Sequence, residues 1–65
     1  MKPNKKRFYK HLAAHMRALR VTANMSQIKW AKVLGITQGH VSRIEDGKRK
    51  PTVYEYELAK REVGK

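Results

Sequence analysis

The 65-residue chain contains no cysteine, which excludes disulfide bonds and thiolate zinc sites as sources of stability. Of its three histidines, His11 and His15 are four residues apart and could share a metal, but no third ligand has a suitable place in the sequence, and two ordinary histidines on a helix face are the favoured interpretation. The sequence has no motif for another cofactor, so we expect it to hold neither a metal nor a cofactor. Nor does it contain an apolar run long enough for a signal peptide or a membrane-spanning helix. We therefore expect a cytoplasmic protein with no membrane partner.

Acidic residues are also scarce, since 5 Asp and Glu oppose 16 Lys and Arg and leave a net charge of +11. The imbalance lies in residues 1–51, whereas residues 52–65 carry as many acidic as basic side chains. A surface polarised in this way attracts polyanions, nucleic acid first and an anionic membrane second. We expect residues 52–65 to face away from the partner.

Signatures of catalysis are absent as well. The sequence has no Ser/His/Asp or Cys/His arrangement and no Gly-rich phosphate loop, and its few acidic residues have spacings suited to helix caps and ion pairs. We expect no enzymatic activity and no small-molecule effector.

Apolar residues recur at helical spacing, as Phe8, Leu12, Met16 and Leu19 do in the first segment. Together with helix start and stop signals, this spacing predicts four helices, over residues 8–21, 27–34, 38–45 and 53–63. Residues 8–65 are long enough for one domain, of the all-α class, and residues 1–7 are predicted to form a basic N-terminal arm.

Residues with capping preferences separate these segments. Asn24 suits the left-handed conformation that closes a helix, and Ser26 suits the N-cap of the next one. Gly35 is expected at the following turn, and Thr37 at the N-cap of the third helix. Thr52 and Glu55 are spaced as a capping box, which predicts the start of the fourth helix.

The second and third segments fit two short helices that cross at a tight turn. Such a pair needs a small residue where the helices approach, a turn residue and apolar residues that face a shared core. Ala31 supplies the small contact and Gly35 the turn. The predicted core-facing residues are Trp30, Leu34, Ile36, Val41 and Ile44.

Over residues 16–59 this pattern resembles the phage repressor, Cro and XRE-type regulators, the lambda repressor-like helix-turn-helix proteins. The residues that carry the resemblance are Met16-Arg17, Leu19-Arg20, Met25-Ser26-Gln27, Ala31, Gly35-Ile36-Thr37-Gln38, Val41-Ser42-Arg43-Ile44-Glu45, Gly47-Lys48-Arg49 and Pro51-Thr52. The resemblance implies a compact four-helix fold, a shortened form of the five-helix domain.

In function, the resemblance implies a regulator of transcription in a prokaryotic or phage-infected cell, associated with the nucleoid. It would bind double-stranded DNA through the major groove, most readily as a repressor on a (pseudo)palindromic operator. A restriction controller or an antitoxin-like regulator would show the same sequence pattern. The competing hypotheses are a structural or RNA-binding protein without sequence reading, and membrane binding through the first helix.

Five residues remain at the surface if Val41 and Ile44 face the core, and we expect them to read bases. They are Thr37, Gln38, Gly39, Ser42 and Arg43. The amide of Gln38 suits adenine, while the guanidinium of Arg43 suits either guanine or a phosphate. Because many family members carry a larger polar residue at the position of Gly39, either one base contact is missing or the backbone approaches DNA closely.

A second set is expected to bind DNA phosphates. It comprises Gln27, Lys48, Arg49, Lys50, His40, Lys5, Lys6 and Arg7. The resemblance implies that Gln27 also buttresses the first reading residue. The alternatives are a capping or solvated Gln27, a solvated turn at residues 48–50, a solvated tail at residues 5–7 and a partly exposed His40 beside the interface.

Arg20 and Glu45 occupy places where the family carries a structural ion pair, so the resemblance implies that they hold the first helix to the end of the third. After Ala59 the match fades, which predicts a shortened dimerisation surface. The fourth helix still carries Val53, Tyr54, Tyr56 and Leu58, some of which must close the core while the rest could pair two subunits. We therefore expect a weak homodimer, formed in solution or only on DNA.

Overall fold

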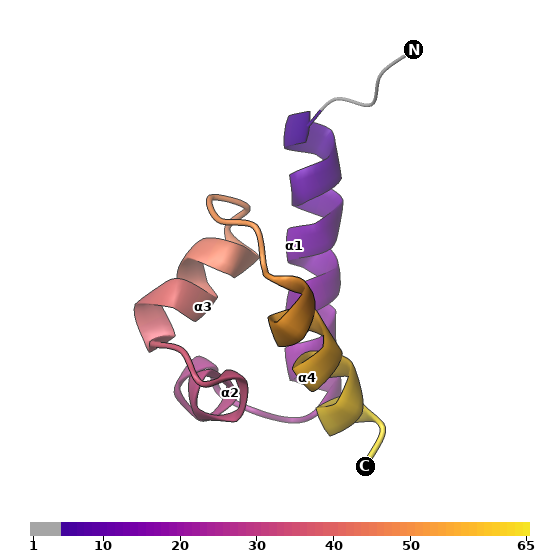
Figure 1. Ribbon diagram of the computed structural model, residues 1–65, viewed down its shortest axis with the longest axis vertical. Coiled ribbons are helices and arrows are strands. Elements are labelled where there is room, and N and C mark those ends of the chain that lie inside the picture. The colour runs from indigo at the N-terminus through magenta and orange to yellow at the C-terminus, as the bar shows by residue number, and fades with distance from the viewer. Residues whose placement is uncertain (1–4) are drawn as a thin grey trace.

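The computed structural model describes the backbone of residues 5–65 and the side chains of residues 10–65. This part of the chain contains four α-helices and no strand: α1 (Lys5–Thr22), α2 (Gln27–Leu34), α3 (Gln38–Glu45) and α4 (Val53–Val63) (Figure 1). The predicted all-α, four-helix fold is confirmed, and the predicted bounds of the last three helices are those observed.

The first helix is longer than predicted, because it begins at Lys5 and ends at Thr22 rather than spanning residues 8–21. Residues 5–7 lack the apolar spacing on which the prediction rested, but Lys and Arg have high helix propensity and extend the helix. The backbone of Lys5, Lys6 and Arg7 is therefore helical, not an arm before the helix. Residues 1–4 of the predicted arm, and the side chains of residues 5–9 including Phe8, lie outside the described residues.

The predicted caps form at the starts of α2, α3 and α4. Ser26 Oγ accepts a hydrogen bond from the Lys29 N–H at 3.2 Å, and Thr37 Oγ1 accepts one from the His40 N–H at 3.1 Å. Thr52 and Glu55 bond each other's backbone N–H groups at 3.0 and 2.9 Å, which completes the capping box. These bonds satisfy backbone donors that a helix start leaves free.

The turn between α2 and α3 requires an unusual backbone conformation. Gly35 has φ 71°, in the left-handed region, and its N–H is directed at the last carbonyls of α2. A side chain would strain this conformation, which is why glycine suits it. The turn brings α2 and α3 together as the crossing pair that the sequence predicts.

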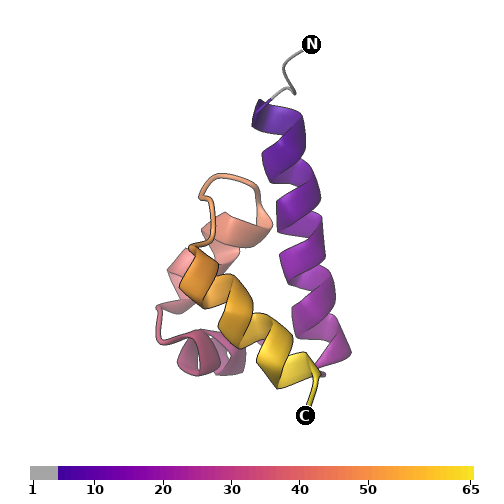
Figure 2. The same ribbon diagram turned by 45° about the vertical axis from the view of Figure 1, so that its right-hand side comes forward.

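The helices enclose a single core. Besides the α2 and α3 pair, α1 packs against α3 and α4, and α4 packs against α2 (Figures 1 and 2). The buried residues that form this core are Met16, Trp30, Ala31, Leu34, Val41, Ile44 and Ala59. In the described part of the chain, no helix is long and apolar enough to cross a membrane.

Candidate nucleic-acid interface

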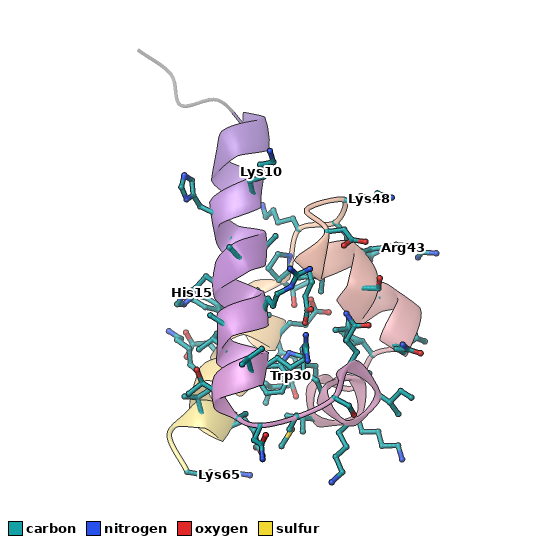
Figure 3. All side chains as sticks on the ribbon, turned by 180° about the vertical axis from the view of Figure 1, so that it is seen from behind. Lys10, His15, Trp30, Arg43, Lys48 and Lys65 are labelled. Atoms are coloured by element: carbon teal, nitrogen blue, oxygen red, sulfur yellow. The ribbon has the colours of Figure 1, made fainter. Side chains whose placement is uncertain are left out.

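Helix α3 has one buried side and one exposed side. Val41 and Ile44 lie in the core, whereas Gln38, Gly39 and Arg43 are exposed. Figure 3 shows the Arg43 side chain extending away from the body of the molecule. The exposed side therefore presents an amide, an uncovered stretch of helix backbone and a guanidinium to any partner that lies along α3.

The two other predicted reading residues, Thr37 and Ser42, are less available for contact with a partner. Thr37 is exposed, but its hydroxyl already accepts the hydrogen bond that caps α3. Ser42 is half-buried. The structure thus places four of the five residues on α3 and Thr37 at its N-cap, with Gln38, Gly39 and Arg43 the most accessible.

The buried side of α3 ends in a carboxylate with several partners. The Glu45 side chain is only 1% exposed. Arg20 of α1 donates to both of its oxygens, from Nε to Oε2 at 2.7 Å and from Nη2 to Oε1 at 3.1 Å. Arg20 also donates from Nη1 to the Met25 carbonyl at 2.9 Å. The predicted ion pair therefore forms, and it joins α1, the loop before α2 and the end of α3.

These contacts determine the charge state of the pair. Burial, the largest single influence, would raise the pKa of Glu45, but the hydrogen bonds from Arg20 and Gln27 and the positive charges of Arg20 and Arg17 together hold that pKa below its usual value of 4.5. The hydrogen bond to Glu45 raises the pKa of Arg20. Both side chains are therefore charged at neutral pH, and the buried carboxylate is neutralised where it lies.

Gln27 belongs to the same network. Its Nε2 donates to Glu45 Oε1 at 3.2 Å, and the residue is half-buried at the first position of α2. The resemblance implied that Gln27 supports the first reading residue, but the hydrogen bond in the structure goes to the last residue of α3. Gln27 thereby fixes the start of α2 against the end of the helix that carries the reading residues.

A second arginine near Glu45, Arg17, belongs to the sequence pattern that carries the resemblance, but no role was predicted for it. Arg17 Nε lies 3.5 Å from Glu45 Oε1, and the Arg17 side chain is 55% exposed. Arg17 precedes Arg20 by three residues and so shares its side of α1. The three-residue spacing of the two arginines is the signal that could have predicted the approach of Arg17 to Glu45.

The loop after α3 carries three exposed cations, Lys48, Arg49 and Lys50. The backbone N–H groups of Lys48 and Arg49 both donate to the Arg43 carbonyl, at 2.9 and 3.2 Å. These bonds hold the loop against the end of α3. Figure 3 shows Lys48 and Arg43 extending toward the same edge of the molecule, so the loop adds positive charge beside the exposed side of α3.

His40 does not share that surface. Its side chain is 18% exposed and its Nε2, which has no hydrogen-bond partner among the described residues, lies 3.8 Å from Glu55 Oε2 of α4. His40 precedes Ile44 by four residues and therefore lies on the buried side of α3. The predicted phosphate contact at His40 is not favoured by this geometry, and we remove it from the candidate interface.

Comparison with known proteins gives one match. A family model described as helix-turn-helix matches residues 16–59, a span that includes the Glu45 network, α2, α3 and the loop of residues 48–50. No curated protein and no solved structure matches the chain significantly.

Proposed function

Because the chain belongs to the helix-turn-helix family of XRE type, whose members are DNA-binding regulators, we propose that it represses transcription by binding a (pseudo)palindromic operator. Binding would be through the major groove, and repression would follow because the bound protein blocks the promoter. The observation that carries the proposal is the exposed side of α3, where Gln38, Gly39 and Arg43 lie together. The opposite side of the same helix is held in the core by Val41 and Ile44.

The dimensions of DNA suit this arrangement. The major groove is wide enough for one α-helix, and base pairs display different donors and acceptors there. In our proposal Gln38 pairs with adenine and Arg43 with guanine, and each such pair discriminates against the wrong base by about 1–3 kcal/mol. Thr37 and Ser42, whose side chains are shorter, would add hydroxyl contacts from the N-cap and the body of α3.

Phosphate contacts would hold α3 in register with the bases. We assign them to Lys48, Arg49 and Lys50 in the loop that is bonded to the end of α3, and to Gln27 at the start of α2. The basic residues at positions 5–7 would extend the contact along α1. Glu45 and Arg20 would act as a scaffold, since their charged groups are used by each other.

A homodimer is the second part of the proposal. On α4, Val53 is 80% exposed and Tyr54 is 71% exposed, and they line one shallow hollow with Glu57, Leu58 and Arg61. The small apolar area predicts a weak dimer, which two adjacent half-sites on DNA would strengthen.

Selection of binding sites from random duplex DNA tests the whole proposal. The expected result is an enriched motif with two symmetric half-sites whose centres lie about 34–36 Å, or one helical turn, apart. A double variant, Gln38→Ala with Arg43→Ala, is the matched control and should enrich no motif while staying folded. Failure of the wild-type protein to enrich any motif would exclude sequence-specific regulation, and an asymmetric single half-site would exclude the dimer.

A further inference from the structure

We propose that Arg17 binds a DNA phosphate beside the reading helix and that Glu45 positions it for this contact, an inference that rests on the proposed function. It adds a residue of α1 to the interface, next to Gln27 of α2. The argument depends on how the charges around Glu45 are distributed.

One buried carboxylate faces two guanidinium groups. Arg20 Nε and Nη2 donate to the two oxygens of Glu45, and Gln27 adds a third hydrogen bond. Arg20 alone therefore neutralises Glu45. Since Arg17 Nε is also only 3.5 Å from Oε1, the cluster retains one net positive charge.

The two arginines differ in what their nitrogens do. Arg20 is 18% exposed, and three of its nitrogens donate to protein oxygens. Arg17 is 55% exposed, and its 3.5 Å approach to Glu45 is too long for a good hydrogen bond. Its guanidinium is thus oriented by charge attraction, while more than half of the side chain remains open to a partner.

The position of the cluster directs Arg17 toward the interface. Glu45 follows Ser42 by three residues and Ser42 follows Gln38 by four, so these residues succeed one another along neighbouring sides of α3. Gln27 touches the same carboxylate as Arg17. A phosphate group that neighbours the Gln38 and Ser42 side of α3 would therefore meet Arg17, whose planar fork of donors suits phosphate oxygens.

A purely structural role predicts different behaviour. An ion pair with one partner this exposed contributes little to stability, because water screens it. Arg17 would then be silent both in folding and in binding. A phosphate contact instead affects binding to every duplex, whatever its sequence, and reduces the dependence of affinity on salt.

The test compares Arg17→Gln with two further variants, using the full chain and duplexes of selected and unrelated sequence. Arg17→Lys keeps the positive charge, and Lys65→Gln removes one charge at the end of the molecule opposite Lys48 (Figure 3). Affinities are measured between 50 and 200 mM salt, and thermal unfolding is recorded for each variant.

For Arg17→Gln we expect weaker binding to both duplexes and a salt slope smaller by about 1, so its disadvantage in affinity shrinks by about fourfold between the two salt concentrations. Arg17→Lys and Lys65→Gln should keep the wild-type slope, and all variants should unfold near the wild-type temperature. Wild-type affinity and slope in Arg17→Gln would overturn the inference, as would a loss that only follows unfolding. If the wild-type protein prefers no sequence, the proposed function fails instead, whatever Arg17 does.

Discussion

The two sides of α3 differ in burial and in bonding. On the inner side Val41 and Ile44 are packed in the core, and the Glu45 carboxylate receives hydrogen bonds from Arg20 and Gln27. On the outer side the side chains of Gln38 and Arg43 are exposed. Because the inner side fixes the helix in place, the outer side can be changed without loss of the fold. The comparison therefore predicts that inner substitutions alter stability and outer substitutions alter recognition.

The largest effect is expected for Arg20→Ala on the inner side. This change leaves the Glu45 carboxylate buried without its main partner, which costs about 3–5 kcal/mol of unfolding free energy. A 65-residue domain has little stability to lose, so the variant should be largely unfolded at room temperature. Urea unfolding monitored by circular dichroism measures the loss. A stable variant that nevertheless fails to bind DNA would show that Arg20 serves recognition and that the inner side of α3 is not only a scaffold.

A pH change probes the same pair without a substitution. The pKa of Glu45 is lower in the folded protein than its ordinary value of 4.5, so the unfolded chain binds the proton more tightly. The contribution of the pair to stability is therefore present above pH 4.5 and is lost as the pH falls through the lower pKa of the folded state. Protonated Glu45 can still accept a hydrogen bond, so the loss should be smaller than in Arg20→Ala.

An NMR titration of the Glu45 side-chain carboxyl, together with urea unfolding at several pH values, measures this effect. We expect a Glu45 pKa below 4.5 and a stability that decreases on acidification below that pH. A Glu45 pKa at or above 4.5 would mean that burial outweighs the hydrogen bonds from Arg20 and Gln27, and that the network does not favour the charged carboxylate.

On the outer side, Arg43→Ala should leave stability nearly unchanged, because the side chain is exposed. It should weaken binding to the selected operator by about 1–3 kcal/mol if it pairs with guanine. Affinities for the operator and for an operator changed at one base pair, measured in the same buffer, separate the two roles of Arg43. Equal weakening on both sequences would assign Arg43 to a phosphate, and a fall in stability would place it in the scaffold.

The sequence predicts the structure best where the signals are local. The starts of α2, α3 and α4 depend on Ser26, Thr37 and Thr52, whose hydroxyls bond backbone groups within the next turn. Such bonds need only a few neighbouring residues, and so the capping pattern fixes these bounds. The predicted start of α1 was wrong because residues 5–7 have high helix propensity but no apolar pattern.

The surroundings of a side chain depend on how the helices pack together, and local sequence patterns do not reveal that packing in detail. His40 was expected to contact a phosphate because it lies within the reading helix, but α4 packs beside it and places Glu55 Oε2 3.8 Å from its Nε2. Arg17 was missed because its link to Glu45 joins residues 28 positions apart. The resemblance identified the Arg20 and Glu45 pair, whereas the further partners of Glu45 emerge only from the three-dimensional structure.

The smallest effect is expected at Gly39 on the outer side of α3, where a substitution should change stability and DNA binding in opposite directions. A Cβ added at Gly39 would meet nothing nearer than Thr37 Oγ1 at 4.0 Å, so the folded chain has room for a side chain. Alanine is favoured over glycine inside a helix by about 1 kcal/mol. Gly39→Ala should therefore raise the unfolding free energy by up to about that amount, measured by urea unfolding.

Nothing in the described part of the chain thus requires glycine at this exposed position, and we expect the requirement to come from DNA. If the backbone of α3 approaches the duplex closely at Gly39, an added methyl group separates the surfaces, and Gly39→Ala binds the operator more weakly although it is more stable. Thr37→Ala offers a contrast, since it removes the cap of α3 and should lower stability by about 1 kcal/mol. Unchanged operator affinity in Gly39→Ala would show instead that α3 lacks one base contact there, and that the outer side tolerates a methyl group as readily as the free protein does.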